Sequence, residues 1–301
     1  MDDEKLFAEI EGFSVTGEPL FQQPHPSETS DVVKKYFKAL KEYEKNPTNA
    51  DNLIWLGRRT AYLGKYRSAI AIFSKGIKQF PEDARMYRHR GHRFITLRLF
   101  KQAISDFEKA GQLIYRKADE IEPDGFPNPK GIPISSLHSN IWYHLGLAYY
   151  LDGDLAKANL AYRHCLEISD NDDKIVSTAH WLYMTLRLLN MKWEADMHLE
   201  KIGDDLEIIE NHQYFDCILM YKGKITPEQL LEKARKQGSM GLSTIGYGIA
   251  NWYFYNEKKD DAKHILEEIL KLENWASFGY IAAEVDHKRI SDSEKLHLMI
   301  D

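Results

Sequence analysis

Residues 140–150 read NIWYHLGLAYY, and this stretch decides the fold together with the residues that follow it. Its Gly146 is followed by Ala158 and Tyr162. The same set of glycine, alanine and aromatic residue occurs twice earlier in the chain, as Gly91, Ala103 and Phe107 and as Gly57, Ala69 and Phe73. The first two sets are 34 residues apart, and the next step is 55, which is 34 plus an insertion of 21. Self-similarity at a fixed period of this length predicts an array of stacked helical or strand units.

The packing of two helices explains why each set combines a glycine, an alanine and an aromatic residue. Two helices that cross closely need small residues at the crossing, which the glycines and alanines supply, while the aromatic fills the space between pairs. Weaker copies follow over 182–199, 214–234 and 249–269. Apolar stripes over 32–43 and 275–285 predict helices that cap the two ends, because each pair buries its apolar face only against its neighbours.

The third copy, with Trp142, Leu145, Gly146 and Tyr149 before Ala158 and Tyr162, resembles the tetratricopeptide pattern W-x2-L-G-x2-Y…A-x3-F. The resemblance covers most of residues 30–285 and is strongest over 50–170. Three stretches, GRRTAYLG at 57–64, RHRGHR at 88–93 and NIWYHLGLAYY at 140–150, look like a group of uncharacterised bacterial members. The resemblance implies an all-α, right-handed superhelix of about five to six helical hairpins with terminal capping helices.

The sequence predicts two regions around this array. Residues 1–28, with three prolines, are expected to be loosely ordered, and 29–301 to form the repeat domain. A long loop over about 118–138 interrupts the domain, because its four prolines and two glycines exclude a regular helix. A loop of this length is often functional, although it could also only cover a surface edge.

The resemblance also implies that the first helix of each hairpin lines a concave groove. Helical geometry then places residues rich in Arg, His, Trp and Tyr on that face, a composition typical of binding hot spots. We therefore expect a ligand site made of Trp55, Arg58, Tyr62, Arg85, Arg88, His89, His92, Asn140, Tyr143, His144, His180 and Trp181.

The planar forks of the arginines suit carboxylate or phosphate. The alternative is that these arginines pair with acids of the same chain, for which the candidates are Asp51, Asp119, Glu120, Glu122 and Asp124. Three further arginines, Arg59, Arg90 and Arg93, are expected to be mainly structural and to hold the insertion or a neighbouring helix. The alternative is that these three arginines line a deeper anion-binding pocket.

These residues favour a scaffold that binds a peptide or protein of acidic character, and not an enzyme. The alternative function is a small anionic-ligand pocket under the 118–138 loop, which leaves an enzymatic role open. We expect no metal and no cofactor, since no catalytic or metal-binding motif occurs. The net charge of −6 gives no reason to expect nucleic acid or membrane as partner. A cytoplasmic location is expected, or export if a leader was removed. The oligomeric state stays open.

Overall fold

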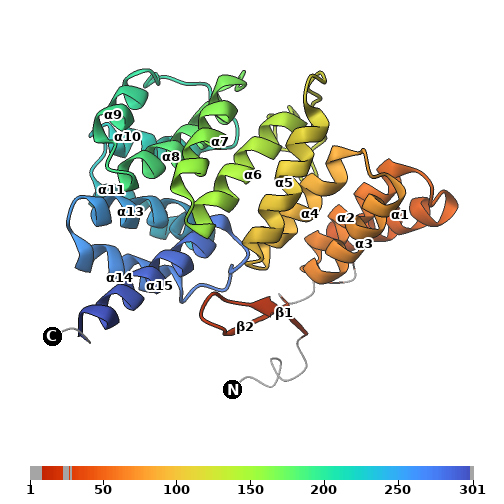
Figure 1. Cartoon of the computed structure of the whole chain (residues 1–301), viewed down its shortest axis with the longest axis horizontal. Coiled ribbons are helices and arrows are strands. Elements are labelled where there is room, and N and C mark those ends of the chain that lie inside the picture. The colour runs from red at the N-terminus through yellow and green to blue at the C-terminus, as the bar shows by residue number, and fades with distance from the viewer. Residues whose placement is uncertain (1–8, 23–26, 28, 299–301) are drawn as a thin grey trace. The chain divides into compact units, whose positions relative to one another are not determined.

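The computed structural model describes residues 9–22, 27 and 29–298, and it is mainly helical (Figure 1). The chain divides into two compact units. Unit 1 comprises Met1–Pro127 and Ser136–Ala148, and unit 2 comprises Asn128–Ser135 and Tyr149–Asp301. The prediction of an all-α, tetratricopeptide-like fold is confirmed.

Unit 1 is built from helices that pack on one another in chain order (Figure 1). They are α1 Asp31–Lys45, α2 Ala50–Tyr62, α3 Tyr66–Gln79, α4 Ala84–Thr96, α5 Phe100–Ile114 and the first part of α6 Leu137–Asp152. Polar side chains start several of them. Ser30, Asn49 and Asp83 each accept a hydrogen bond from a backbone N–H of the first turn. The predicted hairpins correspond to α2 with α3 and α4 with α5.

The glycine–aromatic crossings are present in both hairpins of unit 1. A β-carbon at Gly57 would lie 2.5 Å from the ring of Phe73. A β-carbon at Gly91 would lie 2.9 Å from the ring of Phe107. Both rings are completely buried, so they cannot move aside. The repeat of glycine and aromatic in the sequence is therefore a steric requirement of the helix pair.

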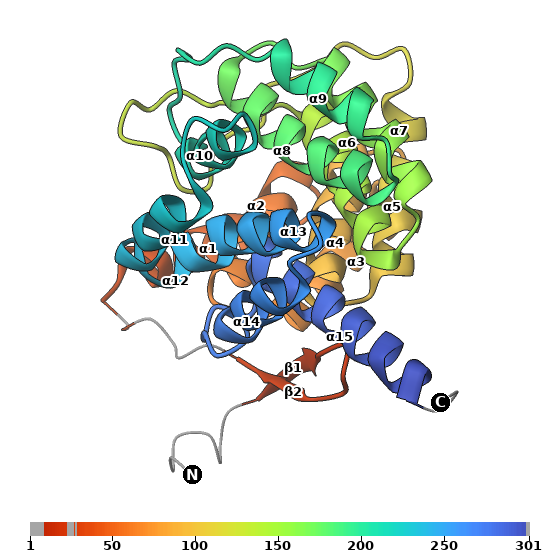
Figure 2. The same cartoon turned by 90° about the vertical axis from the view of Figure 1, so that its left-hand side faces the viewer.

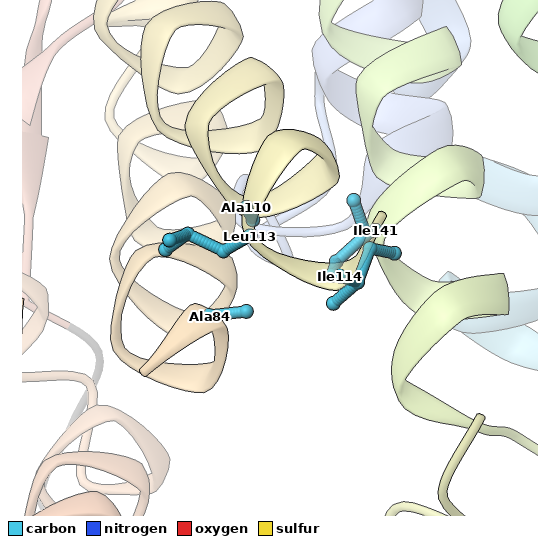
Figure 3. Packing of buried hydrophobic residues seen from close by; sticks show 5 residues of the cluster. All are labelled: Ala84, Ala110, Leu113, Ile114 and Ile141. Carbon is cyan, nitrogen blue, oxygen red and sulfur yellow. The ribbon is translucent and has the colours of Figure 1, made fainter. Parts of the chain in front are cut away.

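The apolar core of unit 1 continues from α4 and α5 to α6. Ile114 near the end of α5 packs with Ile141 of α6, and Ala84 of α4 lies in the same cluster (Figure 3). The cluster is completed by Ala110 and Leu113, with Tyr87 and Leu137 at its edge. This packing fixes α6 beside α5 even though the long loop separates them in sequence.

A small β-hairpin lies at the start of the described chain (Figure 2). Strands β1 Ile10–Phe13 and β2 Pro19–Phe21 pair antiparallel. The side chain of Glu11 accepts a hydrogen bond of 2.8 Å from the backbone N–H of Arg67 in the first turn of α3. Lys65 does not cap that helix with its own side chain, so Glu11 supplies the acceptor. The prediction of a loosely ordered segment over 1–28 is thus wrong for 10–21, while 1–8, 23–26 and 28 lie outside the described residues.

Unit 2 continues the helical pairs. Its helices are α7 Leu155–Glu167, α8 Asp172–Leu188, α9 Lys192–Glu200, α10 His212–Tyr221, α11 Pro227–Lys236, α12 Gly238–Gly241, α13 Tyr247–Tyr255, α14 Lys259–Ile269 and α15 Phe278–Leu298. A π-helical turn, η2 Leu242–Gly246, joins α12 to α13. At Gly279 of α15 a β-carbon would lie 1.9 Å from the carbonyl oxygen of Ser243, so only glycine allows this approach. The predicted terminal helix over 275–285 corresponds to the start of α15.

Candidate binding site

The candidate site is a small cavity of about 100 Å³ in unit 1. Helix α2 contributes Arg58, Ala61 and Tyr62, and helix α4 contributes Arg88, His89, His92 and Arg93; Phe73 of α3 and Glu122 of the loop complete the lining. The spacing in α4 explains the convergence, because residues three and four apart lie on one helix face. We call this cavity the arginine–histidine pocket.

The loop closes the arginine–histidine pocket with one carboxylate. Glu122 Oε2 lies 3.0 Å from Arg88 Nε and accepts a hydrogen bond of 3.1 Å from Asn140 Nδ2. The Arg88 and Glu122 side chains are 9% and 11% exposed, so this ion pair is largely shielded from water. For Arg88, the expected alternative of pairing with an acid of the same chain is therefore what the structure shows.

Two other guanidinium groups of the pocket have no such partner. Among the described residues, neither Arg58 nor Arg93 forms an ion pair with a carboxylate. Arg58 instead lies over the ring of Trp55 at 4.4 Å, and Arg93 lies over the ring of Tyr66 at 5.5 Å. Burial lowers the pKa of Arg93 to about 10. Three guanidinium groups thus share a pocket that contains one carboxylate.

His89 and His92 of the pocket and His144 next to it are neutral, because burial and the neighbouring arginines lower their pKa values well below the usual range. Arg88 Nη1 lies 3.1 Å from His89 Nδ1, and since arginine can only donate, this nitrogen accepts. The proton of His89 is therefore on Nε2, which is 3.9 Å from Glu122 Oε1. His144 next to the pocket donates from Nδ1 to the carbonyl of Asn140 at 2.6 Å, and its ring stacks on Phe107.

The loop is held on the pocket by a second set of contacts. Arg59 Nη1 donates a hydrogen bond of 2.8 Å to the carbonyl of Gly125. A β-carbon at Gly125 would lie 1.8 Å from the hydroxyl of Tyr62, and the ring of Phe126 lies 4.5 Å from that of Tyr62. The part of the loop from 122 to 126 therefore covers the pocket, and the lack of a side chain at Gly125 permits it.

The remaining predicted site residues of unit 1 have other roles. Arg85 is bound by Asp83 at 2.6 Å and by Asp51 at 2.6 Å, so internal acids neutralise it. Tyr143 is half-buried and its ring meets that of His144 edge to face.

Two predicted site residues lie in the core of unit 2. His180 and Trp181 are each 1% exposed. His180 Nδ1 bonds to the hydroxyl of Tyr221 at 3.1 Å, and burial lowers the pKa of this histidine to about 3. Residues so completely enclosed offer no surface to a partner, and we leave both out of the proposed site.

The three further arginines divide between the two expected roles. Arg90 binds Asp106 through two hydrogen bonds of 2.8 and 2.7 Å, and Arg59 holds the loop, as a structural role requires. Arg93 instead lines the pocket, which is the alternative expected for it. Its position was not among the expected site residues because it lies one residue beyond the predicted groove face.

The repeat identified in the sequence has a match among protein families. The family model described as "Tetratricopeptide repeat" matches residues 139–172, which contain α7 and all but the first two residues of α6. The chain thus contains a tetratricopeptide repeat, within a fold of the tetratricopeptide type. Proteins of this family are generally scaffolds and not enzymes, so the fold supports a protein–protein interaction module.

One protein of similar sequence is BBSome complex member BBS4 of Bos taurus, which is 25% identical over 149 residues. The match covers 50% of this chain and 24% of the bovine protein, so the chain spans about a quarter of that relative.

Two solved structures are similar in fold. YrrB, a TPR protein with an unusual peptide-binding site, is 16% identical with a TM-score of 0.43, covering 83% of this chain and 97% of YrrB. Pseudomonas aeruginosa pilF is 15% identical with a TM-score of 0.46, covering 83% and 87%. Because both TM-scores are below 0.5, neither similarity implies a shared site or function for this chain.

Neither a membrane-spanning helix nor a cluster of metal-binding side chains is found in the described residues. None of the helices in these residues is long and apolar enough to cross a membrane. No group of three or more His, Cys, Asp or Glu side chains in the same residues could hold a metal ion.

Proposed function

We propose that the chain binds a protein or peptide partner that places a carboxylate in the arginine–histidine pocket. The observation that carries the proposal is the surplus of positive charge in the pocket lining, where Arg58, Arg88 and Arg93 share the carboxylate of Glu122 and only Arg58 also interacts with Asp124 outside the lining. Hydrogen bonds between guanidinium and carboxylate are among the strong ones, and burial strengthens them further. A partner's acidic side chain or terminal carboxylate would supply the direct ion pair that Arg58 and Arg93 do not form with any described residue.

The aromatic residues at the pocket support a peptide as the source of that carboxylate. Trp55 and Tyr62 are half-buried beside Arg58, and the exposed Phe126 extends the apolar surface. Arginine next to Trp and Tyr is the composition of interface hot spots, where a buried charged contact is surrounded by residues that exclude water. A peptide could use both, with its carboxylate in the pocket and an apolar residue on the aromatic side chains.

A second candidate function is the binding of a free small anion. The cavity of about 100 Å³ favours it, because this space suits one carboxylate or phosphate group and not an extended segment. The two functions differ in what lies outside the pocket. A free anion needs only the arginines, whereas a peptide gains affinity from contacts beyond them.

Affinity purification with mass spectrometry tests the proposed function. Wild-type protein is compared with Arg58→Gln/Arg93→Gln, and the matched control is Arg67→Gln/Lys101→Gln at two exposed positions of the same unit. We expect a partner that wild type and control recover and the pocket variant loses, and whose binding disappears when its acidic segment is replaced by alanines. Equal recovery by all three proteins refutes the proposal. Calorimetry with acetate and phosphate then tests the second candidate, which requires saturable binding of either ion.

A further inference from the structure

Unit 2 contains a separate cavity of about 250 Å³, which we call the α13 pocket. Its walls come from helices α7, α8, α13, α14 and α15, and α13, α14 and α15 lie side by side in Figure 2. The apolar part of the lining includes Leu155, Leu188, Phe254, Leu266 and Ile290. An apolar cavity of about 150 Å³ is enough to hold benzene, so the α13 pocket has room for a larger ring.

One residue that lines this apolar pocket carries a buried polar atom without a partner among the described residues. Asn251 is 4% exposed, and its Oδ1 accepts no hydrogen bond from any described residue. Its Nδ2 donates a hydrogen bond of 3.0 Å to the hydroxyl of Tyr150. A buried acceptor without a donor costs about 1–3 kcal/mol, so such an atom on a residue that lines a cavity points to a ligand that satisfies it.

A chain of hydrogen bonds fixes which way the Asn251 amide points. Tyr247 donates to Asp286 at 2.8 Å, and its hydroxyl lies 2.6 Å from that of Tyr150. The single proton of Tyr247 is used on Asp286, so Tyr150 donates to Tyr247 and can only accept from Asn251. The amide nitrogen must therefore face Tyr150, which leaves Oδ1 as the free acceptor.

The charged groups of the α13 pocket neutralise each other. Asp286 and Arg289 form an ion pair of 3.0 Å, and Arg289 also donates to the carbonyl of Leu151 at 3.0 Å. Neither charge is left for a ligand. A neutral molecule fits this environment better than an ion, because an ion would lose its hydration without gaining a counter-charge.

We propose that the α13 pocket binds a neutral aromatic group of indole or phenol size, which donates one N–H or O–H hydrogen bond to Asn251 Oδ1. The ring fills the space between the leucines, Phe254 and Ile290. The donor satisfies Asn251 Oδ1, for which the described residues supply no hydrogen bond. The group can belong to a free small molecule or to a tryptophan or tyrosine side chain of a partner. The proposal is independent of the arginine–histidine pocket in unit 1.

Calorimetry on the full chain tests the proposal with indole and benzofuran, which have the same shape but differ in the N–H donor. We expect saturable 1:1 binding of indole, with benzofuran at least about tenfold weaker, equivalent to about 1.4 kcal/mol for one hydrogen bond. No saturable indole binding, or equal affinity for both compounds, overturns the proposal.

Two variants locate the binding. Leu188→Trp fills the α13 pocket from its half-buried rim, and Leu160→Trp is the control because Leu160 is 66% exposed on α7 and does not line the cavity. Indole binding should fall at least about tenfold in the first variant and stay unchanged in the second. Unchanged binding in Leu188→Trp would overturn the assignment, and if that variant fails to fold, the comparison of indole with benzofuran on wild type still decides. Titration with the peptide Gly-Gly-Trp-Gly-Gly separates the two sources, since a partner's tryptophan should then bind more tightly than free indole.

Discussion

Replacing Glu122 by Gln tests whether this carboxylate neutralises the buried positive charge of the arginine–histidine pocket. The change removes the pocket's only carboxylate while keeping the size of the side chain. Arg88 and Glu122 are 9% and 11% exposed, so their interaction belongs to the class of buried pairs, for which loss of one partner costs about 3–5 kcal/mol. We expect about 3 kcal/mol, at the low end, because the amide oxygen of Gln can still accept from Arg88 and Asn140.

Urea unfolding followed by circular dichroism measures the loss, and thermal unfolding should show a fall of about 6–12 °C at about 2–4 °C per kcal/mol. The matched control is Glu120→Gln in the same loop, because Glu120 is exposed and its hydrogen bonds to Leu137 and Asp119 are made by its backbone, which the substitution leaves in place. The control should change stability by less than about 0.5 kcal/mol. Added acetate should stabilise Glu122→Gln more than wild type, because it can take the place of the missing carboxylate. Equal stability of the two variants would refute the view that Glu122 neutralises buried arginine.

Three further predictions concern the packing and titration of unit 1. Gly57→Ala should destabilise the protein by about 1–3 kcal/mol in urea unfolding, because the new methyl group overpacks against Phe73. Gly111→Ala, whose β-carbon would lie 3.7 Å from Trp142, should be neutral or stabilising by up to about 1 kcal/mol. Equal effects of the two substitutions would contradict a close helix crossing at Gly57. Gly125→Ala should push the loop off Tyr62 and speed amide hydrogen exchange in the loop residues around 125 without changing exchange in α5; unchanged loop exchange would argue against this contact. The pocket's buried histidines have folded pKa values below the ordinary 6.5, so the unfolded chain takes up their protons first. Their contribution to stability is complete above about pH 6.5 and falls as the pH is lowered, by up to about 1.4 kcal/mol per pH unit for each histidine, and a flat stability between pH 6.5 and 5 would contradict it.

The sequence was sufficient for the fold because its signal is steric and local. Gly57 with Phe73 and Gly91 with Phe107 recur at a fixed distance, and each pair marks one helix crossing that the structure contains. The β-hairpin was missed because its strands are short, and Glu11 acts by capping a helix 56 residues away in sequence.

The candidate site was predictable only in part. Helical spacing identified the arginines and histidines of α2 and α4, and it also named Glu122 among the possible internal acids. It could not say which acid reaches which arginine, because the path of the 118–138 loop depends on contacts such as that of Gly125 with Tyr62. Spacing alone also placed His180 on a groove, although it lies in the core of unit 2.

The α13 pocket had no sequence signal of its own. Tyr150, Tyr247, Asn251 and Asp286 come from three helices that no repeat pattern relates, and 97 residues separate the two tyrosines. Only the packing of the helices brings them together.

The central claim is that Arg58 and Arg93 are available to a carboxylate from outside the described chain. Calorimetric titration with pentaglutamate, with pentaglutamine as the uncharged control, tests it most directly. The account predicts saturable binding of pentaglutamate alone, weakened at least tenfold in Arg58→Gln/Arg93→Gln, since a charge-assisted hydrogen bond contributes about 1.5–3 kcal/mol. Affinity should rise in Glu122→Gln, where the internal competitor is gone. Binding that is absent in wild type, or unchanged in the double variant, would contradict the account.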